Sequence, residues 1–438
     1  MKASTAPAAP RYLCIHGHFY QPPRENPWLE SIEREDSAYP YHDWNERIDA
    51  ECYAQNAASR RLNGTKLISR IVNNYSRISF NVGPTLLWWM EKSAPDTYGA
   101  ILEADAKSAK RYSGHGSAIA QGHSHSILPL ANKRDKTTQI GWGIADFTHR
   151  FKRAPEGIWL PETAVDIETL SLCAAAGIRF TILAPRQAAR VRALGSEAWT
   201  DVTGGGIDPS RAYLQRLPSG QSIAIFFYDG PVSQGVAFER LLDSGEAFAN
   251  RLLSALSERR TWPQLMHIAT DGESYGHHHR HGDMALAHAL ATIRKHSGVR
   301  LTCYGEFLEK HPPTHEVEIL ENTSWSCVHG VERWRDDCGC SAGHAGWNQK
   351  WRKPLREALD WLRDELATRF EQRGAALLRD PWAARDAYIE VVLKRTEPTI
   401  KAFLERHAAG ERSDASDVKR LMLLEMQRHA MLMYTSCG

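Results

Sequence analysis

Two acidic residues, Glu162 and Asp271, each follow a short apolar run of the sequence. Glu162 comes after GIWLP and Asp271 comes after LMHIAT, and both runs predict buried strands. Two carboxyl groups that face each other across a pocket can share a reaction, because one stays ionised as a nucleophile while the other stays protonated and donates to a leaving oxygen. Each acid could instead have only a structural role, and its position in the sequence does not decide between the two. Glu162 could stabilise a helix N-terminus, and Asp271 could form an Asp-Gly turn.

Histidines gather at two other predicted strand ends. The segment HGHFYQPP contributes His16, His18 and Gln21, and the segment GHSHS contributes His123 and His125. A single histidine in such a place is usually structural. Several polar residues at separate strand ends indicate one shared site, since the loops at the carboxyl ends of parallel strands lie together at one rim of an α/β barrel. We therefore expect these side chains to meet the two carboxyl groups in one cleft.

Seven short apolar runs alternate with helical patterns between residues 12 and 305. The runs are 12–16, 77–82, 117–122, 157–160, 178–183, 222–228 and 265–270. Helices are predicted over 166–177, with Asp166 as N-cap and Gly177 as the stop, over 235–256, and from about Asp283 onward. Such alternation predicts right-handed βαβ units, which build either a barrel or an open parallel sheet.

The pattern of the sequence changes after residue 313. One short strand-like segment, EVEIL, follows, and the rest of the chain is helical in pattern, with leucines at helical spacing: Leu355, Leu359, Leu362 and Leu366. A chain of 438 residues is also longer than one ordinary core usually organises. We predict an α/β domain over residues 1–315 and a helical domain over residues 316–438.

Composition excludes several classes of protein. The apolar runs are too short to cross a membrane, and 54 Lys and Arg against 52 Asp and Glu leave no basic tract for nucleic acid. Eight cysteines are too few for a disulfide scaffold, and the first ten residues lack the apolar core of a secretory signal. A cytoplasmic protein is therefore expected. Its 14 tryptophans and 20 histidines suit sugar stacking and proton transfer.

Four segments together resemble the signature regions of glycoside hydrolase family 57, the family of α-amylases, 4-α-glucanotransferases and branching enzymes. HGHFYQPP is similar to the first region, AIAQGHSHSILPL to the second, GIWLPETAVD to the third and HIATDGESYGHHH to the fourth. The resemblance extends from residue 12 to about residue 350. It implies a (β/α)7 barrel followed by a C-terminal α-helical domain that completes the active site.

The resemblance also implies roles for individual residues. Glu162 would be the nucleophile and Asp271 the general acid/base of a retaining hydrolase or transglycosidase, which acts on α-glucan-like oligo- or polysaccharides through a covalent intermediate and needs no cofactor or metal. Residues of the barrel would bind the sugar: His16, His18, Gln21, His125, Trp159 and Glu273. SCVHGVERW would be a fifth region from the helical part, which supplies Trp325, His329 and Trp334. One departure is the GHSHS of the second region, where many relatives carry a more acidic pattern.

Two other functions are weighed against this one. A metal-dependent carbohydrate deacetylase on a related barrel would use the two His-x-His pairs and Asp271 as zinc ligands. We expect the two histidines of each pair to point to opposite faces, so that each pair gives one ligand, which weakens that alternative. A non-catalytic carbohydrate-binding protein is the other alternative, and the presence of both Glu162 and Asp271 argues against it.

A second possible metal site lies between residues 327 and 340. Its residues, Cys327, His329, Cys338 and Cys340, have the spacing C-x-H-x8-C-x-C. This spacing differs from the C-x2-C pairs of the usual zinc knuckles. We therefore favour a glycine-rich loop with reduced thiols over a metal site, while both interpretations stay open.

Overall fold

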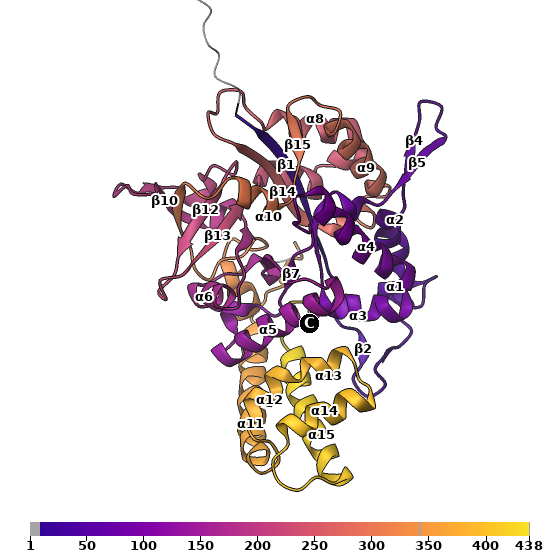
Figure 1. The fold of residues 1–438 in the computed structure, drawn as a ribbon, viewed down its shortest axis with the longest axis vertical. Coiled ribbons are helices and arrows are strands. Elements are labelled where there is room, and N and C mark those ends of the chain that lie inside the picture. The colour runs from indigo at the N-terminus through magenta and orange to yellow at the C-terminus, as the bar shows by residue number, and fades with distance from the viewer. Residues whose placement is uncertain (1–8, 341–342, 438) are drawn as a thin grey trace, which may run out of the picture.

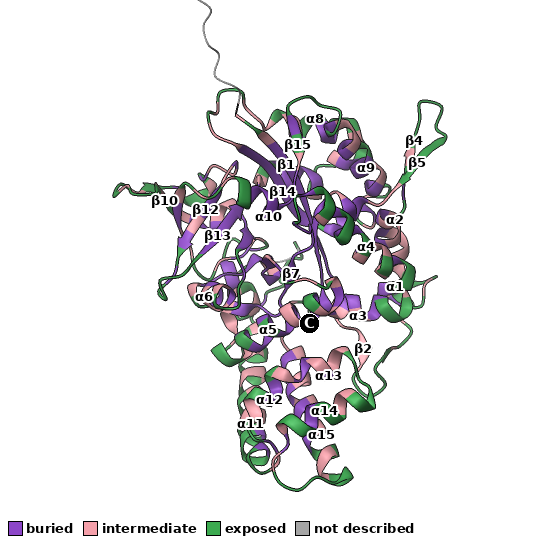
Figure 2. Ribbon diagram, in the orientation of Figure 1, coloured by how far each residue is buried: buried purple, intermediate pink, exposed green. Residues whose placement is uncertain are grey.

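The computed structural model describes residues 9–340 and 343–437, and its centre is a barrel of seven parallel strands (Figure 1). These strands are β1 (Arg11–Phe19), β6 (Ser79–Val82), β7 (Ala120–Gln121), β8 (Gly157–Trp159), β9 (Phe180–Leu183), β13 (Ser222–Phe227) and β14 (Gln264–Asp271). Each coincides with one of the seven predicted runs. Apolar runs of this kind become parallel strands because a barrel strand is covered on both faces, and β1 and β14 are buried along nearly their whole length (Figure 2).

The order around the barrel is β14–β1–β6–β7–β8–β9–β13. β1 and β14 pair in a parallel register that ends with His18 opposite Asp271. β6 reaches the chain before β7 through a bridge between Phe80 and Ala118. The ring closes between β13 and β14, where the Asp229 N–H donates to the His267 carbonyl at 2.8 Å. Since all seven strands run the same way, their carboxyl ends lie at one rim.

Helices cover the outside of the barrel. They are α1 (Trp44–Ile48), α2 (Ala54–Ala57), α3 (Pro84–Ser93), α4 (Pro95–Arg111), α5 (Lys133–Phe151), α6 (Ile167–Ala175), α7 (Gly230–Phe238), α8 (Gly245–Ser254), α9 (Gly282–Ile293) and α10 (Tyr304–Lys310). The predicted ends of α6 are confirmed, because Asp166 caps it and Gly177 follows with φ +86°. The single helix predicted over 235–256 is wrong: Arg240 turns the chain at φ 57°, and Ser244 caps a new helix.

Further strands extend the barrel sheet. They are β10 (Ala188–Ala193), β11 (Thr200–Asp201), β12 (Ala212–Arg216) and β16 (His315–Ile319), with β15 (Val299–Leu301) beside β1 and two separate hairpins, β2–β3 (Glu25–Asn26, Ser31–Ile32) and β4–β5 (Ser59–Leu62, Ile68–Val72). β16 pairs with β10 and β12. The chain immediately after the predicted boundary therefore still belongs to the barrel sheet, and the division at residue 315 stays a prediction.

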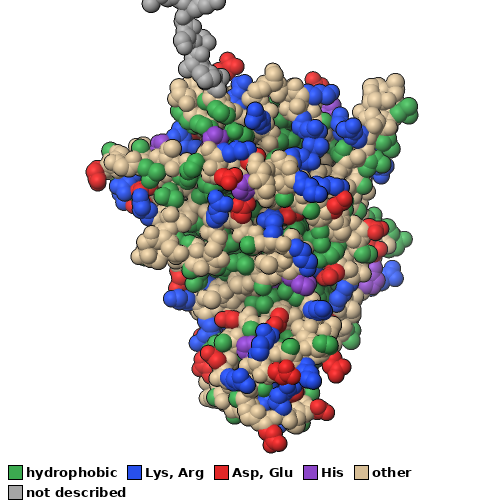
Figure 3. All heavy atoms as spheres, in the orientation of Figure 1, with side chains coloured by type: hydrophobic (Ala, Val, Ile, Leu, Met, Phe, Trp, Pro, Cys, Tyr) green, Lys and Arg blue, Asp and Glu red, His purple; other side chains and the backbone are tan. Residues whose placement is uncertain are grey.

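Residues 352–432 form a group of helices below the barrel (Figure 1). They are α11 (Arg352–Leu377), α12 (Pro381–Ala387), α13 (Ile389–Leu393), α14 (Glu397–His407) and α15 (Asp414–Leu432). Their apolar core also contains Trp142, which comes from α5 of the barrel. On the face shown in Figure 3, acidic and basic side chains alternate over both parts. No helix in the described part of the chain is long and apolar enough to cross a membrane.

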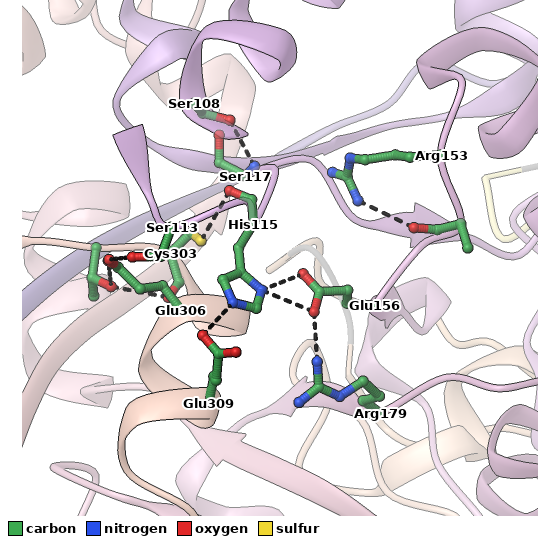
Figure 4. Close-up of polar contacts among 12 residues, drawn as sticks. Ser108, Ser113, His115, Ser117, Arg153, Glu156, Arg179, Cys303, Glu306 and Glu309 are labelled. Atoms are coloured by element: carbon green, nitrogen blue, oxygen red, sulfur yellow. Dashed lines mark hydrogen bonds and ion pairs between the residues drawn. The ribbon is translucent and has the colours of Figure 1, made fainter. Parts of the chain in front are cut away.

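A polar network ties the amino ends of three barrel strands together (Figure 4). His115, which precedes β7, contacts Glu156 before β8 at 2.9 Å and Glu309 of α10 at 2.9 Å. Arg179, which precedes β9, donates to Glu156 at 2.6 Å. This rim is opposite the one that carries Glu162, and in such barrels it serves stability rather than chemistry.

Candidate active site

Glu162 occupies a strained turn at the carboxyl end of β8. Its φ is 57° and the φ of Thr163 is 50°, a left-handed conformation that side chains other than glycine rarely adopt. Gln187 holds this turn from both sides: its amide donates to the Thr163 carbonyl at 2.8 Å and accepts from the Thr163 hydroxyl at 2.8 Å. Such strain persists only where surrounding contacts enforce it, and it concentrates at functional sites. The turn therefore fixes the carboxyl group of Glu162 at the barrel rim.

Trp325, from the segment after the barrel strands, binds Glu162 directly. Its indole Nε1–H donates to the Glu162 carboxyl at 3.0 Å, and its backbone N–H donates to the Glu162 carbonyl at 3.1 Å. Arg186 holds the same segment, because its guanidinium donates to the Ser324 carbonyl at 2.8 Å. The Trp325 ring packs edge-on against Trp159, with ring centroids 5.0 Å apart. The predicted fifth region thus reaches the predicted nucleophile.

Asp271 ends β14 and is exposed at the rim. Desolvation by the surrounding protein, together with the negative charges of Glu273 and Glu162, raises the pKa of Asp271 to about 8. Below that pH the carboxyl group of Asp271 carries a proton. A protonated carboxyl group beside a second carboxyl group that accepts an indole hydrogen bond can supply both an acid and a nucleophile.

Glu273 lies two residues further along and is buried. It accepts a hydrogen bond from the Tyr53 hydroxyl at 2.6 Å and another from the Tyr20 N–H at 3.1 Å. Burial raises the pKa of Glu273 to about 7, although these hydrogen bonds act in the opposite direction. Gln21 lies close enough to hydrogen-bond the same carboxyl group, and it also accepts from Arg24 at 3.0 Å. Gln21 and Glu273 therefore belong to one cluster, as predicted for a shared cleft.

His16 and His18 both stack on Trp159, with ring centroids 5.0 Å apart in each case. The prediction that this pair points to opposite faces is wrong, because residues two apart on a strand share a face. The second pair does diverge: His125 stacks on Tyr20 at 3.8 Å, while His123 packs against Trp142. The cause is a turn after β7, in which His125 has φ 54°.

Asn81, near the end of β6, determines which ring nitrogen of His16 and of His18 carries the proton. Its carbonyl oxygen accepts from His16 Nε2 at 3.0 Å, and its amide nitrogen donates to His18 Nδ1 at 2.8 Å. His18 Nε2 then donates to His125 Nε2 at 3.0 Å. Burial lowers the pKa of His16 and of His125 to about 3. Burial and the neighbouring His125 lower the pKa of His18 well below its ordinary value of 6.5, so all three rings are neutral at pH 7.

The hydrogen bonds of His16 and His18 argue against a zinc-dependent deacetylase site at the barrel rim. The second ring nitrogen of His16, Nδ1, contacts the Ser79 hydroxyl at 3.0 Å, so both of its nitrogens already have partners. His18 likewise uses both nitrogens within the protein. Among the described residues, the histidines and Asp271 that a deacetylase would use as ligands do not form a group of three or more converging ligand atoms.

The end of the helical part also reaches this site (Figure 1). Ser436 exchanges two hydrogen bonds with His125: its N–H donates to the His125 carbonyl at 2.9 Å, and its hydroxyl lies 2.5 Å from Nδ1. Trp334 donates from its indole to the Ser436 carbonyl at 3.1 Å. Burial raises the pKa of Cys437, and the nearby carboxyl groups of Glu162 and Asp271 add to this effect.

Several residues predicted to contact sugar are buried in the structure. Trp159, His16 and His125 are fully buried, and His18 is nearly so. Trp159 stacks on both His16 and His18 and so holds their rings in place. The ring of His329 contacts Cys327 and Cys340. Contact of the predicted residues with a sugar stays a prediction.

Sequence reasoning missed four residues of the site. They are Tyr20, Tyr53, Asn81 and Gln121, of which Gln121 accepts from the Asn81 amide at 2.6 Å. Asn81 and Gln121 end predicted strands, and Tyr20 follows His18 at the spacing that shares a face, so the signal for these three was present. Tyr53 comes from a helical turn far from any strand end, and no local pattern indicates its contact with Glu273.

A cavity of about 590 Å³ lies beside this site, between the barrel and the helical part. Its lining includes Trp28, Trp88, Arg150 and Arg428. Neither Glu162 nor Asp271 lines this cavity. We assign the chemistry to the rim with the two carboxyl groups, because an acid of raised pKa, a hydrogen-bonded carboxylate and a strained turn meet there.

Comparison with known proteins agrees with this geometry. The model of Glycosyl hydrolase family 57 matches residues 16–320, and the model of a Domain of unknown function (DUF3536) matches residues 347–438. No protein of curated function matches the chain in sequence.

Among solved structures, the chain is similar in fold to an amylase, a glucanotransferase and a branching enzyme. A novel exo-type maltose-forming amylase from Pyrococcus sp. ST04 has 15% identity and a TM-score of 0.73, over 98% of this chain and 75% of that one. A 4-alpha-glucanotransferase from Thermococcus litoralis has 15% identity and a TM-score of 0.55, over 96% and 55%. A GH57-type branching enzyme from Pyrococcus horikoshii has 16% identity and a TM-score of 0.58, over 97% and 88%.

Proposed function

Because the chain belongs to glycosyl hydrolase family 57, we propose that it is a retaining glycoside hydrolase or transglycosidase that acts on α-glucan oligo- or polysaccharides. One observation carries the assignment of roles: Asp271, with a pKa raised to about 8, stands at the same rim as Glu162, which a strained turn and Trp325 hold in place. The solved structures with amylase, glucanotransferase and branching-enzyme titles support the choice of α-glucans.

The first step of the proposed reaction makes a glycosyl-enzyme. A carboxylate oxygen of Glu162 attacks the anomeric carbon, and Asp271 donates its proton to the glycosidic oxygen as that C–O bond breaks. In the second step, the Asp271 carboxylate takes a proton from water or from a sugar hydroxyl. The resulting oxygen nucleophile attacks the anomeric carbon, and the bond to Glu162 breaks.

We propose that the part of the chain after the barrel completes this site. Trp325 hydrogen-bonds the nucleophile, and Ser436 hydrogen-bonds His125. Removal of the indole donor would cost the carboxylate a hydrogen bond of about 1.5–3 kcal/mol. A cytoplasmic setting is part of the same proposal, supported by eight cysteines that are all free thiols in the described residues.

Incubation of the purified protein with maltooligosaccharides and glycogen tests this function. We expect shorter or rearranged α-glucans by chromatography, and no products from cello-oligosaccharides. Glu162→Gln should abolish turnover and keep the fold, because an amide of the same shape cannot form the glycosyl ester. Glu197→Gln, at an exposed acid, is the matched control. Full activity of the Glu162 variant would refute the assignment.

A further inference from the structure

Four metal-binding side chains gather on the loop that follows Trp325. The Sγ atoms of Cys327, Cys338 and Cys340 and a ring nitrogen of His329 all lie within 4.8 Å of one another. No other group of three or more His, Cys, Asp or Glu within residues 9–340 and 343–437 converges in this way. The spacing in the sequence argued against a metal here, so this convergence comes from the fold.

The three distances among Cys327, His329 and Cys340 fit a tetrahedron, and the thiol of Cys338 lies within 4.8 Å of the other ligand atoms. Tetrahedral zinc, with Zn–S of about 2.3 Å and Zn–N of about 2.0–2.1 Å, places two sulfurs about 3.8 Å apart and a sulfur about 3.6 Å from a nitrogen. Cys327 Sγ lies 3.8 Å from Cys340 Sγ. The Nδ1 atom of His329 lies 3.7 Å from Cys327 Sγ and 3.5 Å from Cys340 Sγ. The observed edges therefore match the size of a zinc site.

The surrounding backbone explains how an unusual spacing can form this site. Gly339 stands between two of the cysteines with φ +77°, a conformation that a side chain would strain, and it lets both thiols turn toward one point. Arg352 donates from its guanidinium to Cys338 Sγ at 3.5 Å. Outer hydrogen bonds of this kind orient metal ligands and stabilise thiolates.

We propose that Cys327, His329, Cys338 and Cys340 bind one Zn²⁺ in a closed structural site. Three soft thiolates and one imidazole select zinc over hard cations such as Ca²⁺ or Mg²⁺. Four protein ligands leave no open position, so the metal has no part in glycoside chemistry. The site instead fixes the loop between Trp325, which hydrogen-bonds Glu162, and Trp334, which hydrogen-bonds Ser436.

Metal content of the full chain tests the proposal. After purification with zinc and gel filtration, elemental analysis by mass spectrometry should find about one zinc per chain. Cys340→Ser and His329→Ala should each lower the zinc content at least tenfold, whereas His344→Ala on the same loop and Cys437→Ser should retain it. Zinc is counted directly, so the test does not depend on any glycan being a substrate.

Two further measurements separate ligand loss from misfolding. His329→Cys replaces one ligand by another and should retain zinc, where His329→Ala does not. With Co²⁺ in place of zinc, the full chain should show the intense visible absorption of tetrahedral cobalt–thiolate, and Cys338→Ser should lose it. Three results would overturn the proposal. They are a full chain that binds no zinc, a Cys327–Cys340 disulfide in protein purified under reducing conditions, and an unchanged zinc content in Cys340→Ser.

Discussion

At the scale of single residues, the environment gives the two carboxyl groups different tasks. Asp271 stands near two other acids, and burial with their negative charge raises its pKa to about 8. Glu162 instead accepts a hydrogen bond from the Trp325 indole. Two carboxyl groups with such different surroundings divide into an acid and a nucleophile without any difference in their intrinsic chemistry.

The first prediction follows from the raised pKa of Asp271. A general acid must be protonated, so kcat/KM should fall as pH rises through about 8. Asp271→Asn should remove this basic limb and lower the rate on oligosaccharides by about 10²–10⁴-fold. Aryl glycosides with good leaving groups should lose much less, because they need little protonation. A basic limb that persists in Asp271→Asn would assign the proton to another group.

The second prediction concerns stereochemistry. A nucleophile and acid of a retaining enzyme stand about 5–5.5 Å apart, whereas an inverting enzyme needs about 6.5–9.5 Å for a water molecule. Placement of Glu162 and Asp271 at the ends of rigid strands favours a fixed separation. Proton NMR of the first product from an α-linked substrate should show the α-anomer. Initial appearance of the β-anomer would exclude direct attack by Glu162.

The residues that sequence reasoning placed well are those that end strands. One rim holds Glu162, Asp271 and His18. The strand–helix alternation of the sequence predicts parallel strands, and parallel strands place their carboxyl ends at the same rim. Residues that come to the site from loops are different. His329 was predicted in the cleft and lies in the cysteine group instead, because positive-φ glycines such as Gly339 redirect its loop. Spacing alone does not report such a turn.

At the scale of elements, His115 connects several elements at the amino-terminal rim of the barrel, opposite the rim of Glu162. Two carboxylates, Glu156 and Glu309, flank its ring (Figure 4). Burial alone would lower the pKa of His115, but these two partners outweigh it, so the pKa is raised above the ordinary value of 6.5. The network joins the segments before β7 and β8 to the last turn of α10, although these elements are far apart in sequence.

The third prediction is a pH dependence of stability. A histidine whose folded pKa is raised stabilises the fold at pH below its unfolded pKa, and that contribution is lost as pH rises through the folded pKa. His115→Gln should therefore lose more stability at about pH 5.5 than at about pH 8.5 relative to the wild type. Urea midpoints at the two values measure this, with His296→Gln at an exposed site as control. Equal losses at both pH values would contradict the role of His115.

Element boundaries were predicted where a local signal ends the helix. Asp166 and Gly177 delimit α6 because capping and a left-handed stop depend on neighbouring residues only. The split between α7 and α8 was missed, since Arg240 adopts φ 57° without a glycine to indicate it. The leucine pattern of α11 did predict a helix, yet Leu355 and Leu362 stay exposed, because periodicity shows a face but not what covers it.

At the scale of the whole molecule, the barrel and the helical part share α5. Trp142 of α5 belongs to the apolar core of the helical part, and its indole donates to the Asp386 carbonyl at 2.9 Å. Ser436, which follows α15, hydrogen-bonds His125. The position of the helical part therefore bears on the geometry of the rim, which supports the proposal that the helical part completes the site.

The last prediction tests that shared interface through Arg385 of α12. Its guanidinium is buried and donates to Asp135 at 2.7 Å, to the Thr138 hydroxyl at 2.6 Å and to the Arg134 carbonyl at 3.0 Å, all on or beside α5. Arg385→Ala would remove these hydrogen bonds and leave the carboxylate of Asp135 without its cationic partner. Loss of one partner of a buried pair costs about 3–5 kcal/mol.

Arg406→Ala is the matched control, because Arg406 pairs with Glu390 at the surface of the same helical part, where a pair contributes about 0–1 kcal/mol. Urea unfolding should separate the two variants by more than about 2 kcal/mol. Arg385→Ala should also lower kcat/KM under native conditions, since a loosened α5 interface displaces Ser436 from His125. If the two variants unfold at the same urea concentration, the buried contact does not join the parts, and the rim must depend on the barrel alone.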